Sequence, residues 1–428
     1  MKKLMSPGRI IAFGFLSIIL IGTLLFLLPI SQESPGSISF TDALFTATSA
    51  VCVTGLSTFD AGSILTPFGE AVLAILIQLG GLGFACLSIG IVMLTGQKIF
   101  FSQRNLVKEA LNYGSMDGIV TLVKSVLFIT VTFEGIGTLL YFLVFIRDYD
   151  FLTSLRYGLF HAVSAFNNAG FDILGFGNSL VSYSDNIAIN LITCFLVISG
   201  GIGYLVIKEV IFRFKNRRFT LHTKVVLSMT AVLLLLGTVL FKITEDYSWL
   251  ESFFMSTSTR TAGFTTVDLS NISNAGLVIY AVWMFIGASP TSTGGGIKTT
   301  TFLVIITALY SHISSGKPTL FKRTISKDLL YKAFIILTMG LTVVIISLML
   351  MCAACPEIEF NDLLLEVVSA FGTVGLSTGI TPTLPSVAKY ILIVTMFIGR
   401  LGPLTIASLW IFKKPSSISY AEETLTLG

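Results

Sequence analysis

Apolar residues along this chain gather into eight long windows that are separated by shorter polar stretches. The windows are residues 10–30, 68–94, 120–146, 187–212, 225–241, 276–309, 330–352 and 388–412. A helix of about 20 apolar residues crosses the hydrocarbon core of a bilayer, so each window predicts a transmembrane helix. With 54% hydrophobic and only 12% charged residues, the 428-residue chain is too apolar for a single water-soluble core. The pattern therefore predicts an integral membrane protein.

The eight windows form four pairs, and each pair encloses a polar segment that ends in a glycine and a large apolar residue. The four segments are residues 49–56, 164–171, 257–264 and 369–376. They align without gaps on Gly55, Gly170, Gly263 and Gly375, and a small polar residue stands six places before each glycine. This repetition predicts a pseudo-four-fold pore built from one polypeptide.

We therefore expect an all-α membrane protein of four tandem helix/pore-loop/helix units, with eight transmembrane helices and four short re-entrant pore helices. The expected units are residues 1–118, 119–222, 223–328 and 329–428. Glycine-rich runs support this division, because they recur in the second long helix of each unit, at residues 78–83, 199–203, 294–297 and 399–403. Small residues there allow close helix approach or local unwinding.

Charge sets the orientation of these windows. The basic residues fall on one side of the predicted topology, as Lys2, Arg104, Arg217 and Lys413 illustrate, whereas most acidic residues fall on the other side. Because basic loops stay in the cytoplasm, we expect both termini to be cytoplasmic and the four glycine segments to enter from outside. No small-residue cleavage site follows the first window, so we expect that window to be retained.

Residues that favour helix N-termini precede three of the four segments. They are Thr41 with Asp42, Ser248 with Glu251, and Asn361 with Asp362. The second unit departs from this pattern, with Thr153 and Ser154 as candidate caps and Arg156 in the first turn. Four converging helices would direct the partial negative charge of their C-terminal ends toward a common cavity, where a cation would be stabilised.

The loops after these helices predict an ion-selectivity filter. Irregular backbone at membrane depth is tolerated only where it is buried in protein or lines a water-filled path, and its carbonyl oxygens can replace the water around an ion. Glycine at the narrowest position permits strained dihedral angles. The predicted filter residues are Val53, Thr54, Gly55, Asn168, Ala169, Gly170, Thr261, Ala262, Gly263, Thr373, Val374 and Gly375.

With these motifs the chain resembles the KtrB-type membrane subunits of bacterial potassium uptake systems, within the Trk/Ktr/HKT superfamily. The resemblance covers essentially the whole chain and is carried by the four glycines and by residues 289–300. It implies potassium translocation across the bacterial plasma membrane, often dependent on sodium, by a homodimer with one pore per protomer. It also implies a cytosolic nucleotide-binding RCK regulatory ring of the KtrA/KtrC type. Glycine at all four filter positions favours potassium over sodium within this superfamily.

The resemblance also implies a gate beneath the filter. Residues 287–301 interrupt the third inner helix with small polar residues and a proline, and a merely kinked helix is the alternative. The predicted gate residues are Gly294, Gly295, Gly296, Lys298 and Arg400. Lys298 would be either a tethered competitor cation or a partner of backbone carbonyls. Arg400 would place a fixed positive charge below the filter, or would form an internal ion pair with Glu134.

Other polar residues near the segments have structural interpretations. Arg260 would point away from the pore and brace its loop against an acid, and Asn167 and Asn168 would act as scaffold. His161 is expected to be a satisfied helix residue. The five cysteines lie in or beside apolar windows and are expected to be inert thiols.

The sequence supports two other function classes less well. A secondary transporter with broken helices predicts inverted repeats, whereas these four copies run in one orientation. An enzyme is not expected, because the sequence has no HExxH motif or carboxylate cluster, and no cofactor or nucleic acid is implied. The basic loops at 96–118, 208–224 and 311–332 would contact anionic lipid or the regulatory ring, and the tail at 422–428 would pack at a dimer interface.

Overall fold

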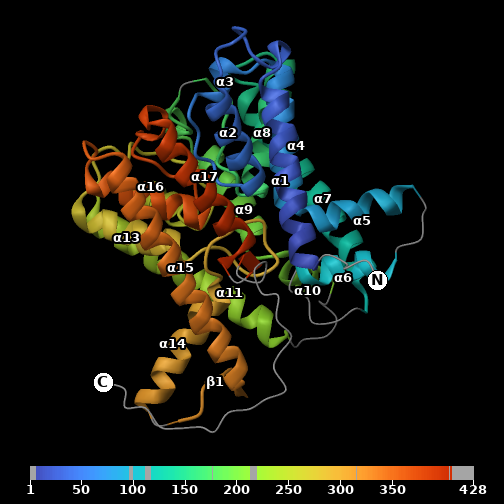
Figure 1. The fold of residues 1–428 in the computed structure, drawn as a ribbon, viewed down its shortest axis with the longest axis vertical. Coiled ribbons are helices and arrows are strands. Elements are labelled where there is room, and N and C mark those ends of the chain that lie inside the picture. The colour runs from blue at the N-terminus through green and yellow to red at the C-terminus, as the bar shows by residue number, and fades with distance from the viewer. Residues whose placement is uncertain are drawn as a thin grey trace.

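The computed structural model describes residues 6–95, 100–110, 117–175, 177–212, 219–314, 316–403 and 405–406. The predicted C-terminal tail lies outside these residues, as does the end of the last window. Within them the chain is mostly helical, with α2 and α3 at one end of the molecule and α14 and β1 at the opposite end (Figure 1).

The elements recur in four groups, which we call units 1 to 4. Unit 1 holds α1 (Pro7–Phe26), η1 (Pro29–Ser31), α2 (Phe40–Cys52), α3 (Ala61–Ile64), α4 (Pro67–Leu82), α5 (Phe84–Leu94) and α6 (Phe101–Ala110). Unit 2 holds α7 (Ile119–Phe145), α8 (Phe151–Phe166), η2 (Val181–Tyr183), α9 (Ile187–Gly201) and α10 (Tyr204–Phe212).

Unit 3 holds α11 (Leu221–Thr244), α12 (Trp249–Ser258), α13 (Asn274–Phe285) and α14 (Thr299–Ile313), followed by the antiparallel pair β1 (Thr319–Leu320) and β2 (Arg323–Thr324). Unit 4 holds α15 (Lys327–Ala354), α16 (Phe360–Gly372), η3 (Thr381–Thr383) and α17 (Ser386–Leu401). Each unit thus runs from a long outer helix through a short pore helix to an inner helix.

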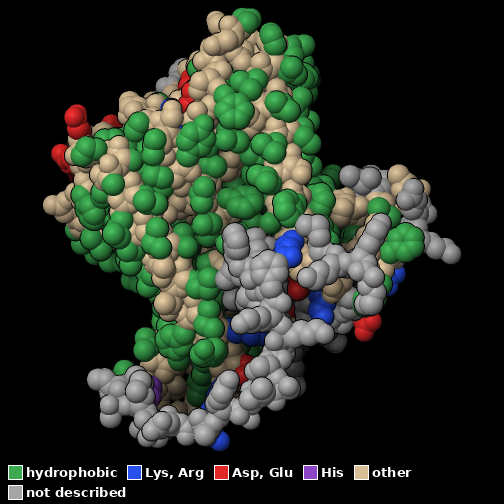
Figure 2. All heavy atoms as spheres, in the orientation of Figure 1, with side chains coloured by type: hydrophobic (Ala, Val, Ile, Leu, Met, Phe, Trp, Pro, Cys, Tyr) green, Lys and Arg blue, Asp and Glu red, His purple; other side chains and the backbone are tan. Residues whose placement is uncertain are grey.

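The first helix of each unit is continuous, as its apolar window predicts. These helices, α1, α7, α11 and α15, are each long and apolar enough to cross a membrane. Their flanks expose large apolar side chains, including Phe13, Val131, Leu235 and Ile345, and Figure 2 shows such side chains spread over the sides of the upper body. Lipid rather than water is the solvent that suits this surface.

The inner helices are not single straight spans, and this corrects the prediction from their windows. The pair α4 and α5 is bent by 98°, and the pair α9 and α10 by 101°. Each break falls on a glycine in the left-handed region, Gly83 with φ 77° and Gly203 with φ 90°. A residue without a Cβ adopts this conformation at little cost, so the local unwinding expected from the glycine runs does take place.

The inner helix of each unit packs against the pore helix of the next. The contacts are α4 with α8, α9 with α12, α13 with α16, and α17 with α2. The last of these joins unit 4 to unit 1 and closes the series. Four pore helices are thereby held around one centre, in the order of the chain.

Glycines in the inner helices allow close packing against the pore helix of the same unit as well. A Cβ added at Gly80, Gly200 or Gly399 would collide with a carbonyl oxygen near the C-terminal end of a pore helix, that of Val51, Phe166 or Phe371 respectively. These three acceptors stand four places before the motif glycine of their units. Three of the four glycine runs recognised in the sequence are therefore sites of helix contact.

The pore helices begin slightly earlier than the sequence predicts. In α12 the predicted cap Ser248 and first-turn acid Glu251 are confirmed, and together they form a capping box. Ser39, and not Thr41, caps α2, while Asp42 lies in its first turn. Asp150 caps α8 by accepting from two backbone amides, so the predicted caps Thr153 and Ser154 are wrong.

In the fourth pore helix the predicted capping pair is also displaced. Helix α16 begins after Glu359, whose side chain makes no capping bond, and Asp362 lies in its first turn. An aspartate so close to a helix N-terminus still complements the helix dipole.

Candidate functional site

The four loops that follow the pore helices share one backbone conformation. The motif glycines have positive φ angles, 96° at Gly55, 70° at Gly170, 82° at Gly263 and 98° at Gly375. The residues two places earlier are also left-handed, with φ 58° at Val53, 59° at Asn168, 75° at Thr261 and 51° at Thr373. Left-handed non-glycine residues are uncommon, so their recurrence at one position of all four units marks a shared local structure.

The four motif glycines, which we call the glycine ring, lie around a single centre. A Cβ added at Gly55 would lie 2.6 Å from the carbonyl oxygen of Ala169, and one added at Gly170 would lie 2.6 Å from that of Ala262. Equivalent contacts would join Gly263 to the Val374 carbonyl and Gly375 to the Thr54 carbonyl. Each glycine thus faces the carbonyl that precedes the glycine of the next unit, and the last contact returns to unit 1.

Hydroxyl groups of the pore helices anchor these loops. The amide of Gly55 donates to Ser49 Oγ over 3.0 Å, and that of Gly375 donates to Ser369 Oγ over 3.0 Å. In unit 2 the hydroxyl of Ser164 donates instead to the carbonyl of Phe171 over 2.7 Å. The small polar residue predicted six places before each glycine therefore fixes the loop in three units. In unit 3 the neighbouring Ser258 does so by donating to the Phe264 carbonyl.

A second recurring position was not recognised in the sequence. Two places after each ring glycine, a side-chain oxygen accepts a hydrogen bond from the amide two residues further on. The pairs are Ser57 with Phe59, Asp172 with Leu174, Thr265 with Val267, and Ser377 with Gly379. Ser, Thr and Asp favour such turns. Their occurrence at one offset from the glycine is the signal that could have revealed the position.

Residues 286–298 form the loop between α13 and α14, which we call the intramembrane loop. It lies directly against the segments that run from the left-handed residues to the ring glycines, which we call the filter strands. The amide of Gly295 donates to Thr373 Oγ1 over 2.9 Å, and the hydroxyl of Thr293 lies 3.4 Å from Asn168 Oδ1. A Cβ added at Gly294 would collide with the hydroxyl of Thr261. The loop therefore touches the left-handed residues of three units.

Arg400 fastens the intramembrane loop to unit 1. Its guanidinium donates to the carbonyl oxygen of Thr293 in the loop and to that of Gly80 at the end of α4. The predicted ion pair with Glu134 is wrong, because Oε1 of Glu134 accepts from Asn167 over 3.0 Å. Helix breaks leave carbonyl oxygens without intrahelical partners, and a guanidinium with five donors suits several of them at once.

Lys298 binds the same loop from within. Its ammonium donates to the carbonyl of Gly294 over 2.6 Å and lies 3.4 Å from that of Gly295. Of the two interpretations open from the sequence, this geometry agrees with the bond to backbone carbonyls. Of the predicted gate residues, Gly294, Gly295, Lys298 and Arg400 are thus brought together.

The glycine Gly296 joins this group through its backbone. It has φ 66°, and a Cβ there would lie 3.3 Å from the carbonyl oxygen of Gly372 at the end of α16.

Arg260 does not have the predicted acidic partner. Its side chain is buried, and its guanidinium donates to Thr230 Oγ1 over 3.4 Å. No carboxylate of the described residues forms an ion pair with it. The scaffold interpretation of Asn167 agrees with its bonds to Gln78 and Glu134, which hold the start of the second loop. The Nδ1 atom of His161 lies 2.7 Å from the Tyr157 carbonyl of its own helix.

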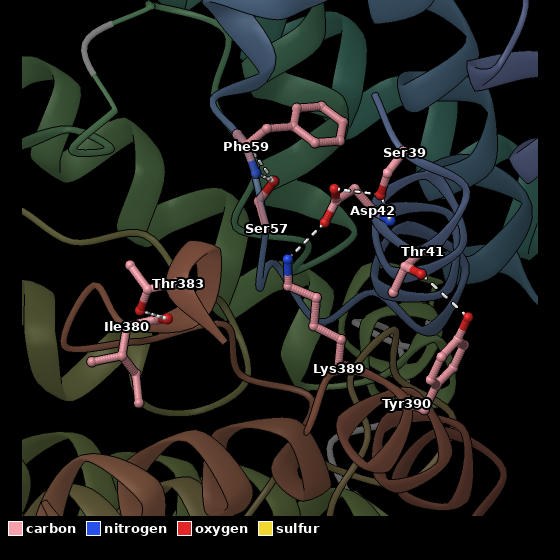
Figure 3. A network of polar contacts seen from close by, with 9 residues as sticks. All are labelled: Ser39, Thr41, Asp42, Ser57, Phe59, Ile380, Thr383, Lys389 and Tyr390. Carbon is pink, nitrogen blue, oxygen red and sulfur yellow. Dashed lines mark hydrogen bonds and ion pairs between the residues drawn. The ribbon is translucent and has the colours of Figure 1, made fainter. Parts of the chain in front are cut away.

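At the rim formed by the N-terminal end of α2, an ion pair joins the first and last units. Lys389 Nζ in α17 lies 2.8 Å from Asp42 Oδ1 in α2, and Tyr390 lies 3.2 Å from Thr41 (Figure 3). Burial raises the pKa of Asp42, but hydrogen bonds from Lys389 and Ser39 outweigh it and hold that pKa below its ordinary value. The rim contact closes the circle of units on the side opposite the intramembrane loop.

Comparison with known proteins gives one consistent result. The family TrkH, described as cation transport protein, matches residues 9–245 and 219–421. The Ktr system potassium uptake protein B of Bacillus subtilis is 38% identical over 440 residues, covering 99% of this chain and 97% of that protein. The potassium/sodium uptake protein NtpJ of Enterococcus hirae is 37% identical over 445 residues, covering 100% and 98%.

A solved structure shares the fold. The potassium transporter TrkH from Vibrio parahaemolyticus superposes with a TM-score of 0.76 at 19% identity, covering 96% of this chain and 86% of that one.

Proposed function

The chain belongs to the TrkH family of cation transport proteins, and we propose that it carries potassium ions across the plasma membrane of a bacterium through the centre of its four units. Relatives that are similar over their full length are named potassium uptake proteins. The observation that carries the proposal is the glycine ring, in which each glycine faces a backbone carbonyl of the next unit. Carbonyl oxygens in a ring replace the hydration shell of a potassium ion.

The proposed filter consists of the ring glycines and the two residues before each of them. Its oxygen ligands would be backbone carbonyls, including those of Thr54, Ala169, Ala262 and Val374. The converging C-terminal ends of the pore helices add partial negative charge that favours a cation. Since all four ring positions are glycine, potassium is the proposed substrate and sodium a coupling or activating ion.

The proposed gate is the intramembrane loop together with Arg400. Its bonds to Thr373 and Asn168 set it against the inner ends of the filter strands, where it would obstruct the cytoplasmic path. Opening would require the loop to leave these partners and the guanidinium of Arg400. The ammonium of Lys298 would then hold the shape of the loop while it moves.

The proposed assembly follows from the resemblance to KtrB-type subunits. It is a homodimer in the plasma membrane with both termini in the cytoplasm, bound to a cytosolic RCK regulatory ring. Three relatives are named as parts of a Ktr system, which agrees with a transporter of more than one component.

Potassium uptake by a bacterium that lacks its own uptake systems tests the function. Cells that express this chain should grow at low potassium and take it up, with and without added sodium as separate arms. Gly263→Ser and Gly375→Ser should weaken the apparent potassium affinity at normal protein levels, because any Cβ at these positions meets a carbonyl oxygen. Unchanged kinetics in both variants would refute a filter at the glycine ring and favour a secondary transporter of another solute.

A further inference from the structure

A buried carboxyl group joins the fourth pore helix to the segment that leaves its filter strand. Glu366 lies within α16 and is fully buried. Its Oε1 atom accepts from the hydroxyl of Ser377, two places after Gly375, and lies 2.9 Å from the hydroxyl of Thr381. The same oxygen thus contacts both ends of the segment 377–381.

The two hydroxyl groups also connect to each other and to the backbone. Ser377 Oγ accepts from the amide of Gly379 over 2.9 Å and lies 3.0 Å from the hydroxyl of Thr381. Thr381 is buried and begins η3, which leads into α17. The carboxyl group therefore fixes the path by which the chain turns from the glycine ring toward the last inner helix.

In the part of the chain that the structure describes, the other three units have no such connection at this position. Nine places before their ring glycines stand Thr46, His161 and Phe254. The hydroxyl of Thr46 has no hydrogen-bond partner, and Nδ1 of His161 contacts its own helix. Phe254 has no polar group. Within the described residues, Glu366 alone among these four positions bonds to the segment that follows its filter strand.

Unit 4 differs from the other units in where the apolar contact of this segment lies, because Ile380, one place later, packs into the cluster. Four places after the ring glycine stand Phe59, Leu174 and Val267, all of which pack into hydrophobic clusters. Unit 4 has Gly379 instead, which is exposed, has φ 94° and meets nothing within 4 Å of an added Cβ. A glycine without contacts gives the segment more conformational freedom than its counterparts.

We propose that Glu366 is a positioning residue for the potassium filter, holding by hydrogen bonds a segment that has glycine where the other units have an apolar side chain. This inference rests on the proposed function. By holding Ser377 and Thr381, the carboxyl group fixes the filter strand that ends at Gly375. This glycine faces the Thr54 carbonyl of the adjacent unit 1. The carboxyl group acts as an acceptor, because Oε1 accepts from both hydroxyl groups and Oε2 has no partner in the described structure.

Potassium uptake kinetics can distinguish this positioning role from a role of Glu366 in folding alone. The variants to measure are Glu366→Ala, Ser377→Ala and Glu366→Gln. Loss of a hydrogen-bonded anchor should raise the KM for potassium about three- to tenfold in both alanine variants, with membrane levels of the protein unchanged. The Glu366→Gln variant retains an acceptor oxygen and should keep the wild-type KM. The double alanine variant should be no worse than either single one, because both remove the same contact.

The matched control is Thr46→Val, which alters the equivalent position of unit 1 and removes a hydroxyl without a partner. Its KM should equal that of the wild type. Equal damage by Glu366→Gln and Glu366→Ala would overturn the proposal, because the charge rather than the anchor would then act. A wild-type KM in both alanine variants would overturn it as well. Failure of the wild-type chain to take up potassium would refute the proposed function instead.

Discussion

The backbone amide of Gly295 donates a 2.9 Å hydrogen bond to the hydroxyl of Thr373. One partner belongs to the loop that interrupts the third inner helix, and the other to the strand that leads to the fourth ring glycine. The proposed gate and the proposed filter are therefore in direct contact, without an intervening element. Loosening of the loop would change the surroundings of the innermost filter position.

Replacing Thr373 by valine should raise potassium uptake at limiting gate activation. The change removes the acceptor for the Gly295 amide, and a buried donor without a partner costs about 1–3 kcal/mol, here in the closed arrangement. Valine fits the backbone, since Val53 holds the same position in unit 1 with φ 58°. The opening equilibrium should shift toward the open arrangement by about fivefold or more, and the maximal uptake rate per molecule should rise with it.

Thr338→Val serves as the control for this change, because that exposed hydroxyl on α15 bonds only to its own helix. Its rate should match that of the wild type. A Thr373→Val protein that is well expressed and transports no faster than the wild type would contradict a closing role for the Gly295 contact.

Two substitutions of Arg400 can show whether its guanidinium acts as a bridge between units or only as a positive charge. Its guanidinium contacts the carbonyls of Thr293 and Gly80, which belong to different units. A lysine keeps the charge but has no planar fork to reach both acceptors. Arg400→Lys should therefore raise basal uptake about as much as Arg400→Ala does, by severalfold.

Rubidium or potassium influx into cells, normalised to protein in the membrane, would measure both variants. An Arg400→Lys protein with wild-type flux beside an open Arg400→Ala protein would favour the fixed charge over the bridge. Arg147→Ala is the control, because it removes an exposed arginine just after α7 and alters neither acceptor.

The sequence predicts the glycine ring, but it does not predict which groups the nearby charged residues contact. Four glycines at one offset within four similar segments require a shared backbone, and the structure has it in the φ angles of Gly55 and its counterparts. The partners of Arg400 are carbonyls, and every residue has one. Only the three-dimensional break after α4 leaves those of Gly80 and Gly81 accessible.

Arg260 is a second residue whose partner could not be predicted from the sequence. A buried arginine favours an acidic partner in any sequence-based argument, because desolvation of an unpaired charge is costly. Its contact is instead a hydroxyl, that of Thr230 in α11. No pattern along the chain encodes which helix face lies opposite a given loop residue.

Glycine contacts between inner helices and pore helices should be sensitive to a single methyl group. Gly200→Ala and Gly399→Ala would force the pore helix away, since an added Cβ meets the carbonyl of Phe166 or Phe371. Overpacking of this kind costs about 1–3 kcal/mol. Thermal unfolding of purified protein in detergent should show a lower midpoint for both variants.

The control for this series is Gly135→Ala in α7, where an added Cβ meets nothing within 4 Å. Alanine is the better helix former by about 1 kcal/mol, so this variant should be as stable as the wild type or more so. Midpoints that fall equally in all three variants would show that the close approach at Gly200 and Gly399 has no special role.

The ion pair between Asp42 and Lys389 should stabilise the closed circle of units, because it joins α2 of unit 1 to α17 of unit 4. Lys389→Met should lower the unfolding midpoint at neutral pH by about 1–3 °C, as expected for a partly exposed pair. The double variant Asp42→Asn with Lys389→Met should lose little more than either single variant, since both remove one contact. Lys327→Met, at the exposed start of α15, should leave the midpoint unchanged.

The pH dependence of this effect has a definite sign. The pKa of Asp42 lies below its ordinary value of 3.8, so the pair contributes stability above pH 3.8 and loses it as the pH falls through the lower folded-state value. The difference in midpoint between wild type and Lys389→Met should thus be full at pH 7 and shrink below pH 3.8. A difference that persists undiminished at pH 2 would mean that the aliphatic stem of Lys389, rather than its charge, supports the rim.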